Sequence, residues 1–269
     1  MRRPGDRPPG GSVDAAGYRT LMLVASLRLA GAGDRGSRAV RRALRSAALG
    51  LADRAERAWV RRIDSYRPRL AADAVAAVPD PLGRPDSERV AEAGEAVRWM
   101  SMPPVLGRLC TRLVRELEPG SCLELGTGFG VSAAYQAAAL ELNGAGALTS
   151  LDIDGMANLA EAGLSALGLS HRVELVRGPI EETIADAVER STPIDLAVLD
   201  ADHTEHGTLG AFEAVVPGLA ADAVVVVDDI NWTDQMRAAW SSLRADRRVR
   251  TAVGLRRLGI LVVDGGGRD

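Results

Sequence analysis

The sequence contains no lysine, and all 33 of its basic residues are arginines. Aromatic residues make up only 3% of the 269 residues, so the core must be built mainly from Ala, Val and Leu. Residues 1–70 contain 16 arginines and 6 acidic residues, whereas residues 71–269 contain 17 arginines and 30 acidic residues. Nucleic-acid binding needs a basic face near the site, so the acidic second part does not favour nucleic acid as a partner.

Cysteines and long apolar runs are also scarce. Cys110 and Cys122 are the only cysteines, which excludes a disulfide framework or a zinc site, and we expect both to pack as small hydrophobic residues. No apolar run reaches the roughly 18 residues that a membrane span needs. Residues 20–32 resemble the apolar part of a signal peptide, but Arg28 interrupts them and a long Pro-rich region precedes them. We therefore expect a cytoplasmic protein.

A glycine-rich stretch from Ser121 to Ser132 is the most informative part of the chain. An apolar segment leads into Gly126, Gly128 and Gly130, and an Ala-rich helix is expected to follow at 131–142. Glycine is needed where the backbone turns with positive φ or approaches a ligand closely. Asp152 follows Gly130 by 22 residues and ends a second apolar segment, where a carboxylate can bind both ribose hydroxyls. This arrangement predicts a site for a nucleotide-like cofactor.

Strands and helices are expected to alternate from this point to the C-terminus. This pattern predicts a doubly wound α/β domain over residues 101–269. The run 224–227, which is apolar on both faces, is typical of a strand covered by helices on both sides. Strands are predicted at 121–125, 147–151, 173–177, 196–199, 223–227, 251–253 and 259–263. Helices are predicted at 105–117, 131–142, 156–167, 179–189, 208–219 and 233–243.

The N-terminal part is predicted to be a disordered tail over 1–17 and a helical extension over 18–100 that caps the domain or forms an oligomer. Helices are expected at 18–29, at 38–63 and, with Ser87 as N-cap, at 87–98, with a loop at 78–86. The helix at 38–63 has one apolar and one arginine-rich face. It packs against its own domain or a dimer partner, or lies on an acidic membrane; its small alanines favour packing.

Acidic residues follow two of the predicted strands at the edge where their carboxyl ends meet. Asp200, Asp202 and His203 follow the strand at 196–199, and Asp228 and Asp229 follow the strand at 223–227. Ligands of open α/β sheets lie at this edge. Carboxylates that lie close together repel one another unless a cation or protons neutralise them, and Mg²⁺ prefers such oxygen ligands.

On these motifs, residues 86 to 263 resemble class I S-adenosylmethionine-dependent methyltransferases, in particular the catechol-O-methyltransferase-like and bacterial sugar O-methyltransferase families. The motif that carries the resemblance is Glu-x-Gly-x-Gly-x-Gly, from Glu124 to Gly130. The resemblance implies a Rossmann-like, mostly parallel seven-stranded sheet with an antiparallel edge strand. It also implies transfer of a methyl group from S-adenosylmethionine to a hydroxyl of a small molecule, such as a secondary metabolite.

The resemblance further implies roles for individual residues. Asp200, Asp228 and Asp229 match the positions that bind Mg²⁺, and Asp202 or His203 takes the place of the lysine base of the catechol type. The residues expected to bind the cofactor are Ser101, Glu124, Gly126, Gly128, Gly130, Ser132, Asp152, Gly178, Ile180 and Asp200.

Other functions fit the same motifs. One is a metal-independent methyltransferase that uses His203 as base, and another is a cofactor-binding partner subunit without turnover. Transfer of an aminopropyl group is a further possibility, since fold alone does not separate these activities. The apolar face of the N-terminal helix is also consistent with a homodimer.

Overall fold

The computed structural model describes residues 15–77, 93–98 and 100–265, and a seven-stranded sheet forms its centre. The strand order is β3-β2-β1-β4-β5-β7-β6. β1 to β5 run parallel, and β7 lies antiparallel between β5 and β6, so the hairpin of β6 and β7 closes one side of the sheet. The strands are β1 (Ser121–Leu125), β2 (Ala147–Asp152), β3 (Val173–Arg177), β4 (Ile194–Leu199), β5 (Leu219–Val227), β6 (Val249–Leu255) and β7 (Leu258–Val263).

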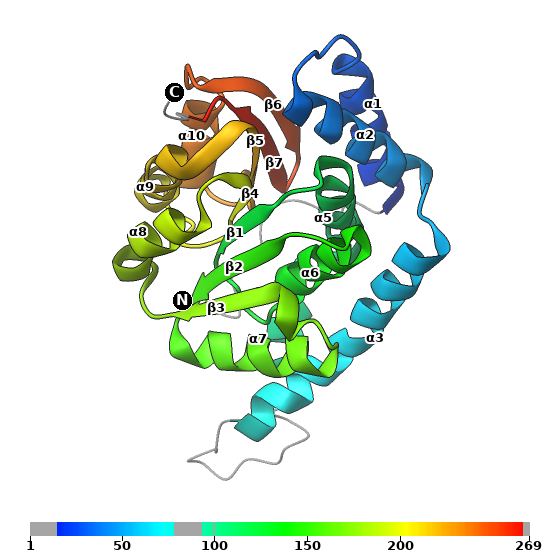
Figure 1. The fold of residues 1–269 in the computed structure, drawn as a ribbon, viewed down its shortest axis with the longest axis vertical. Coiled ribbons are helices and arrows are strands. Elements are labelled where there is room, and N and C mark those ends of the chain that lie inside the picture. The colour runs from blue at the N-terminus through cyan, green and yellow to red at the C-terminus, as the bar shows by residue number, and fades with distance from the viewer. Residues whose placement is uncertain (1–14, 78–92, 99, 266–269) are drawn as a thin grey trace.

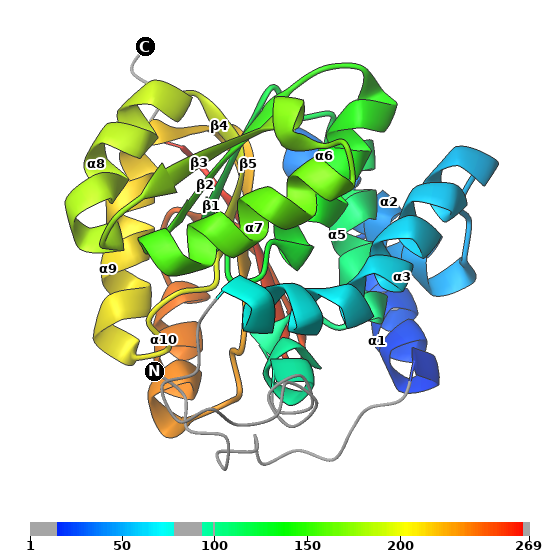
Figure 2. The ribbon, with the colours of Figure 1, turned by 90° about the horizontal axis from the view of Figure 1, so that it is seen from below.

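Helices cover both faces of the sheet (Figure 1; Figure 2). One face carries α8 (Ile180–Ser191), α9 (Glu205–Val215) and α10 (Asp234–Leu243). The other face carries α1 (Ala15–Arg28), α2 (Arg35–Leu49), α3 (Arg54–Ala77), α5 (Pro104–Leu117), α6 (Val131–Asn143) and α7 (Asp154–Ala166). The predicted doubly wound α/β class is therefore confirmed.

β5 shows why the sheet needs two helical layers. Val224 and Val226 belong to the core under the N-terminal helices, whereas Val225 and Val227 belong to the core under α8 to α10. Successive side chains of a strand point to opposite faces, so a run of valines without polar interruption has to be covered twice. β5 starts at Leu219, four residues earlier than predicted, because Pro217 ends the preceding helix in a 3₁₀ turn, Val216–Gly218.

The prediction of one helix over 38–63 is wrong. Gly50 ends α2 in the left-handed conformation, with φ +67°, and its backbone N–H reaches back to the carbonyl of Ala47. A new helix, α3, starts after Asp53, whose carboxylate accepts a hydrogen bond of 2.8 Å from the backbone N–H of Glu56. A left-handed glycine followed by an N-cap carboxylate ends one helix and begins another.

The arginine-bearing helix α2 packs on its own domain. Its apolar residues Val40 and Leu44 are fully buried in the core shared with α5 and the sheet. At Gly36 a Cβ would come within 2.2 Å of the backbone oxygen of Asp222, so only glycine allows this close approach to the sheet. The expectation that this helix packs against its own domain is confirmed for α2.

Several predictions near the N-terminus fall partly outside the described residues. Residues 15–17 are helical and open α1, so the predicted disordered tail does not extend to residue 17. The tail up to residue 14, the loop at 78–86 and the N-cap at Ser87 lie outside the described residues, whereas 93–98 are helical as expected. Within the part of the chain that the structure describes, no helix is long and apolar enough to cross a membrane.

Candidate functional site

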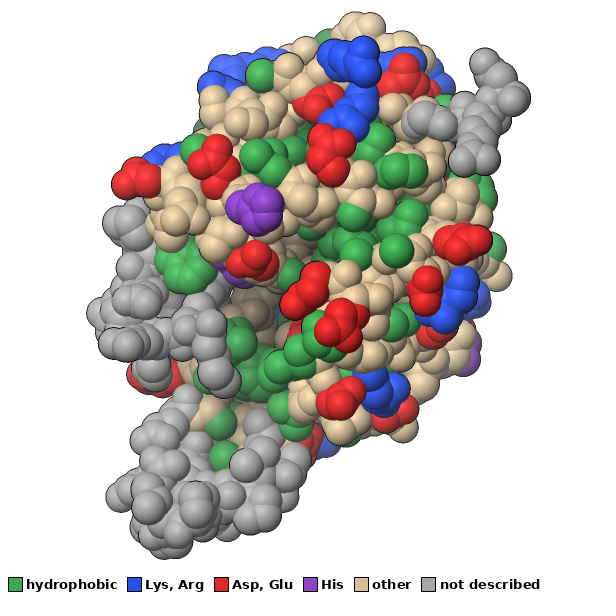
Figure 3. All heavy atoms as spheres, turned by 90° about the vertical axis from the view of Figure 1, so that its left-hand side faces the viewer, with side chains coloured by type: hydrophobic (Ala, Val, Ile, Leu, Met, Phe, Trp, Pro, Cys, Tyr) green, Lys and Arg blue, Asp and Glu red, His purple; other side chains and the backbone are tan. Residues whose placement is uncertain are grey.

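A cavity of about 720 Å³ opens at the carboxyl ends of β1, β2 and β4. Figure 3 shows this side of the molecule, with a hollow that has hydrophobic and acidic side chains around it. We call one part of its wall the glycine half, which consists of Gly126, Gly128, Ser132, Asp152 and Ile180. We call the other part the acidic half, which consists of Asp200, Asp202, His203, Thr204 and Trp232.

The three motif glycines have three different structural roles. Gly126, at φ +93°, passes so close to the next strand that a Cβ would lie 2.2 Å from the backbone oxygen of Asp200. Gly128, at φ +53°, has no atom within 4 Å of where its Cβ would be, and it lines the cavity. Gly130 does not line the cavity; it allows close packing of α6 on Ala160 of α7. The backbone at Gly128 thus leaves room for a ligand.

Asp152 lies at the end of β2 beside this turn, as predicted. Its carboxylate accepts hydrogen bonds from the backbone N–H groups of Gly128 at 2.7 Å and Ile153 at 2.8 Å. Burial raises the pKa of the Asp152 carboxyl despite these hydrogen bonds. Each carboxylate oxygen has a second lone pair, so the side chain can accept two further hydroxyl groups from the cavity.

Two serines and one isoleucine of the predicted cofactor set also line the cavity. Ser132 lies in the first turn of α6, and the backbone N–H groups of a helix N-terminus can bind an anion. Ser101 Oγ is buried and has no hydrogen-bond partner among the described residues. A buried hydroxyl without a partner is costly unless a ligand or water completes it. Ile180 lines the cavity, whereas Gly178, although it turns with φ +132°, does not.

Glu124 is fully buried beneath the glycine half and does not line the cavity. It accepts hydrogen bonds from Ser150 Oγ at 2.6 Å and Gln136 Nε2 at 2.8 Å. Burial raises the pKa of the Glu124 carboxyl to about 7, although hydrogen bonds from Ser150 and Ser132 lower it. Glu124 therefore supports the turn from below and does not itself contact the cavity.

The three carboxylates predicted to bind Mg²⁺ are paired with basic side chains, Asp228 and Asp229 with Arg257 and Asp200 with His203. The guanidinium of Arg257 binds both carboxylate oxygens of Asp228, with Nε 2.9 Å from Oδ1 and Nη2 2.6 Å from Oδ2, and its Nε lies 3.0 Å from Oδ1 of Asp229. Neither Asp228 nor Asp229 lines the cavity, and the described residues contain no group of His, Cys, Asp or Glu side chains arranged to hold a metal ion. The residues present do not fit the metal because an arginine already supplies the positive charge.

His203, which belongs to the acidic half, links the cavity to the ion pairs that Arg257 makes with Asp228 and Asp229. Its Nε2 lies 3.2 Å from Oδ1 of Asp200 and 3.3 Å from Oδ2 of Asp229. Its ring makes an edge-on contact with Trp232, with centroids 5.2 Å apart and planes at 82°. The imidazole is therefore held by two carboxylates and one aromatic ring while it lines the cavity.

The carboxylates of the cluster differ in their affinity for protons. Burial raises the pKa of Asp200 to about 6, and the nearby charge of Asp228 adds to this rise. Burial also raises the pKa of Asp228, but the guanidinium of Arg257 outweighs it and holds that pKa below its usual range. The arginine thus keeps Asp228 ionised.

Arg257 is the residue of this cluster that the sequence analysis missed. The signal that could have found it is the hairpin: β7 runs antiparallel to β5 with Gly259 opposite Val227, so the turn before β7 must lie beside the residues that follow β5. Further cavity residues were not named in the sequence analysis, either because they stand between the motif positions or because they belong to no motif; they include Thr127, Phe129, Val131, Ile153, Met156, Met100, Met102 and Thr204.

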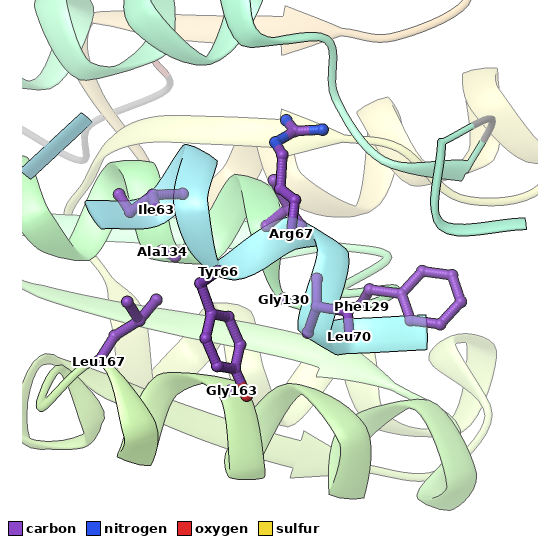
Figure 4. A pocket seen from close by; sticks show the side chains of 10 residues that line it. Ile63, Tyr66, Arg67, Leu70, Phe129, Gly130, Ala134, Gly163 and Leu167 are labelled. Carbon is purple, nitrogen blue, oxygen red and sulfur yellow. The ribbon is translucent and has the colours of Figure 1, made fainter. Parts of the chain in front are cut away.

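The N-terminal helix α3 contacts segments that line the large cavity. Figure 4 shows Tyr66 of α3 directed toward Gly163 of α7, in a small second cavity that Phe129 and Gly130 also line. Arg67 of α3 donates a hydrogen bond to the backbone oxygen of Met102, next to Ser101. The N-terminal extension therefore fixes two segments of the large cavity, the glycine-rich turn and the segment at Ser101.

Residues 123–230 match the family model of a methyltransferase domain. No curated protein matches the chain. Among solved structures, TomG, an O-methyltransferase from Streptomyces achromogenes that is involved in tomaymycin synthesis and was solved with S-adenosylmethionine, is 21% identical. It superposes with a TM-score of 0.55 over 74% of this chain and 90% of TomG.

Two further structures have the same fold. An O-methyltransferase from Bacillus cereus bound to S-adenosylhomocysteine is 22% identical, with a TM-score of 0.53 over 69% of this chain and 94% of that chain. Cofactor-bound Rv0187 from MTB is 19% identical, with a TM-score of 0.56 over 86% of this chain and 98% of that chain. Likenesses at this identity establish the fold, and the fold is the one that the sequence motifs predicted.

Proposed function

We propose, from the premise that this chain carries a class I S-adenosylmethionine-dependent methyltransferase domain, that it transfers a methyl group to an oxygen of a small-molecule acceptor. The observation that carries this proposal is a single cavity in which the glycine half, with Asp152, faces the same space as His203. A methyltransferase domain of this class uses S-adenosylmethionine as its cofactor, and His203 is a group that can remove a proton from the acceptor.

The glycine half suits the cofactor. Asp152 would accept hydrogen bonds from the ribose hydroxyls, and Gly128 would let the backbone approach the nucleoside closely. Ser132 and the start of α6 would hold the carboxylate of the methionine part. When bound, S-adenosylmethionine supplies an activated methyl group on a sulfonium. The residues of the chain hold it in place and exclude water from the reacting atoms.

His203 is the general base in this proposal. Carboxylates only accept hydrogen bonds, so Nε2, which lies between Asp200 and Asp229, carries a proton. The imidazole would take the proton of the acceptor hydroxyl, and the two carboxylates would stabilise the imidazolium that results. Asp202, the second predicted base, also lines the cavity; its carboxylate packs against Gly207 in the first turn of α9.

The lining of the cavity indicates the charge of the acceptor. Three carboxylates line it, those of Asp152, Asp200 and Asp202, and no arginine does among the described residues. Several apolar side chains complete the wall, among them Met100, Met102, Met156 and Trp232. A wall of this kind favours a neutral or cationic aromatic acceptor over an anionic one. The part that TomG plays in tomaymycin synthesis supports a secondary metabolite as the acceptor.

The first test is calorimetric titration of the protein with S-adenosylhomocysteine, followed by methyl transfer from labelled S-adenosylmethionine to a panel of neutral and anionic phenols. We expect binding of S-adenosylhomocysteine and methylation of neutral phenols, with loss of turnover but not of binding in His203→Ala. Absence of binding would contradict the proposal. Binding without methylation of any acceptor would favour a partner subunit without turnover.

We also propose a homodimer in the cytoplasm. Leu23, Val24 and Leu27 form an apolar surface on α1, and Leu27 is 67% exposed. Covering such a surface with a second copy would remove it from water. Both cysteines are free and buried, which is consistent with a reducing compartment. Analytical ultracentrifugation of Leu27→Glu tests the dimer: this variant should sediment as a monomer if the surface is the interface.

A further inference from the structure

Arg257 contacts Asp228 and Asp229, two of the carboxylates predicted to bind a metal, although it lies in a different part of the sequence. It lies in the two-residue turn between β6 and β7, and the antiparallel pairing of β7 with β5 brings this turn to the carboxyl end of β5. The backbone oxygen of Arg257 accepts a hydrogen bond of 2.9 Å from the N–H of Ile230, which ties the turn to the segment after β5. The position of the guanidinium is therefore set by the sheet.

The guanidinium is well paired. The side chain of Asp228 is 0% exposed and that of Arg257 is 20% exposed, and Nε and Nη2 bind the two oxygens of Asp228 side by side. Paired geometry of this kind gives strong, directional hydrogen bonds. A divalent cation needs carboxylate oxygens at about 2.0–2.6 Å. The guanidinium of Arg257 already lies against both oxygens of Asp228, and its positive charge would repel a divalent cation placed there.

Asp229 links Arg257 to His203, which lines the cavity. Its Oδ1 lies 3.0 Å from Nε of Arg257, and its Oδ2 lies 3.3 Å from Nε2 of His203. One carboxylate thus bridges the guanidinium and the imidazole. Arg257 does not line the cavity, so it acts on His203 through Asp229 and not on the acceptor itself.

We propose that Arg257 is a built-in cation that replaces the divalent metal of related sites, so that this chain transfers methyl groups without a metal ion. This inference rests on the proposed function for its reaction and on the contacts of Arg257 for its chemistry. Arg257 is a positioning residue: it neutralises Asp228 and Asp229 and so orients His203. An acceptor gains nothing here from two neighbouring hydroxyls, because no metal is present for them to chelate. A molecule that presents a single hydroxyl therefore suffices as the acceptor.

The first experiment measures metal binding directly. Protein loaded with S-adenosylhomocysteine is titrated with Mn²⁺ up to about 1 mM, which covers the affinity of ordinary carboxylate sites, and free Mn²⁺ is followed by electron paramagnetic resonance. We expect no saturable binding. Saturable binding that Asp228→Asn abolishes would overturn the inference. Failure of S-adenosylhomocysteine itself to bind would count against the proposed function, and Mn²⁺ binding would still be measured on the protein without it.

A pair of matched variants tests the role of Arg257. Arg257→Gln removes the guanidinium, and Arg256→Gln makes the same change at the exposed neighbour in the same turn. We expect Arg257→Gln to lower methyl transfer to a phenol with one hydroxyl by about 100-fold, because a misplaced base is costly, and Arg256→Gln to leave it within about twofold. Arg257→Gln should also bind Mn²⁺, because its carboxylates have lost their cation.

A double variant distinguishes the loss of the guanidinium from unfolding of the protein. Asp228→Asn combined with Arg257→Gln replaces the ion pair by a neutral pair, and it should fold as judged by S-adenosylhomocysteine binding while it fails to bind Mn²⁺. A gain of Mn²⁺ binding in Arg257→Gln alone is a result that a merely structural arginine would not give. If Arg257→Gln folds and keeps wild-type turnover without binding Mn²⁺, the inference is wrong.

Discussion

The glycine half of the cavity is built from backbone and one carboxylate, whereas the acidic half is built from charged side chains that neutralise one another. In the glycine half, Asp152 at the end of β2 is held by backbone N–H groups of its neighbour Ile153 and of the glycine-rich turn after β1, the preceding strand. The acidic half is held by ion pairs behind it, and these join the segments after β4 and β5 to the turn before β7. A site built from local backbone can be recognised in a sequence, whereas a site built from distant side chains depends on the topology.

Removal of the proposed base, His203, should have the largest effect, because it should lower turnover at the acidic half without changing cofactor binding by the glycine half. His203→Ala deletes the imidazole that lines the cavity but touches none of the residues that hold Asp152. We expect methyl transfer to fall by about 10²- to 10⁴-fold, the usual contribution of a general base, while the dissociation constant of S-adenosylhomocysteine stays the same. His206→Ala, at a histidine that does not line the cavity, is the control. A loss of less than tenfold would transfer the base role to Asp202.

The buried carboxyl of Glu124 should make stability depend on pH. Burial raises the pKa of Glu124 to about 7 in the folded protein, above its ordinary value of 4.5, while Asp200 and Asp152 raise it further by their charge. Between these two pH values the unfolded chain ionises and the folded chain does not, so stability is full below pH 4.5 and is lost as the pH rises toward 7. The total loss is on the order of 3 kcal/mol.

Urea denaturation of the wild type and of Glu124→Gln at a series of pH values measures this slope. The stability of the Gln variant should fall much less between pH 5 and 7 than that of the wild type, because its side chain does not titrate. Glu189→Gln, at an exposed carboxyl on α8, controls for the removal of one negative charge. Equal slopes in the wild type and Glu124→Gln would show that Glu124 is ionised in the folded protein.

Loss of the carboxylate that we propose to bind the ribose should weaken cofactor binding by the glycine half. Asp152→Ala removes the acceptor that faces the cavity, and Asp154→Ala makes the same change at an exposed position two residues later. Hydrogen bonds to a charged group contribute about 1.5–3 kcal/mol, so the dissociation constant of S-adenosylhomocysteine should rise by roughly 10- to 100-fold. Calorimetry on both variants checks this, and equal affinities would remove Asp152 from the cofactor site.

A smaller effect is expected where only a methyl group is added. Gly128→Ala places a Cβ in open space but in the left-handed conformation, which costs about 1–2 kcal/mol for a residue with a side chain. The variant should fold with slightly lower stability and bind S-adenosylhomocysteine more weakly, since the methyl group enters the cavity. Thermal unfolding and calorimetry measure the two effects, and unchanged affinity would mean that the cofactor does not approach Gly128.

The fold was largely predictable because its signals are local. All seven strands were located from apolar runs between turns, and the glycine spacing together with Asp152 located the glycine half. The break at Gly50 was missed because apolar residues recur at helical spacing on both sides of it. The sequence predicted a metal because three carboxylates at one edge of the sheet repel one another unless a positive charge lies among them. Only the topology shows that Arg257, 29 residues after Asp228, neutralises them.

The most direct measurement is a crystal structure of the protein with S-adenosylhomocysteine and Mn²⁺, with data collected at the manganese absorption edge. Our account predicts the ribose on Asp152, the guanidinium of Arg257 on Asp228 and Asp229, and no anomalous peak among the carboxylates. An anomalous peak between Asp200, Asp228 and Asp229, with the side chain of Arg257 displaced, would contradict the claim that an arginine takes the place of the metal.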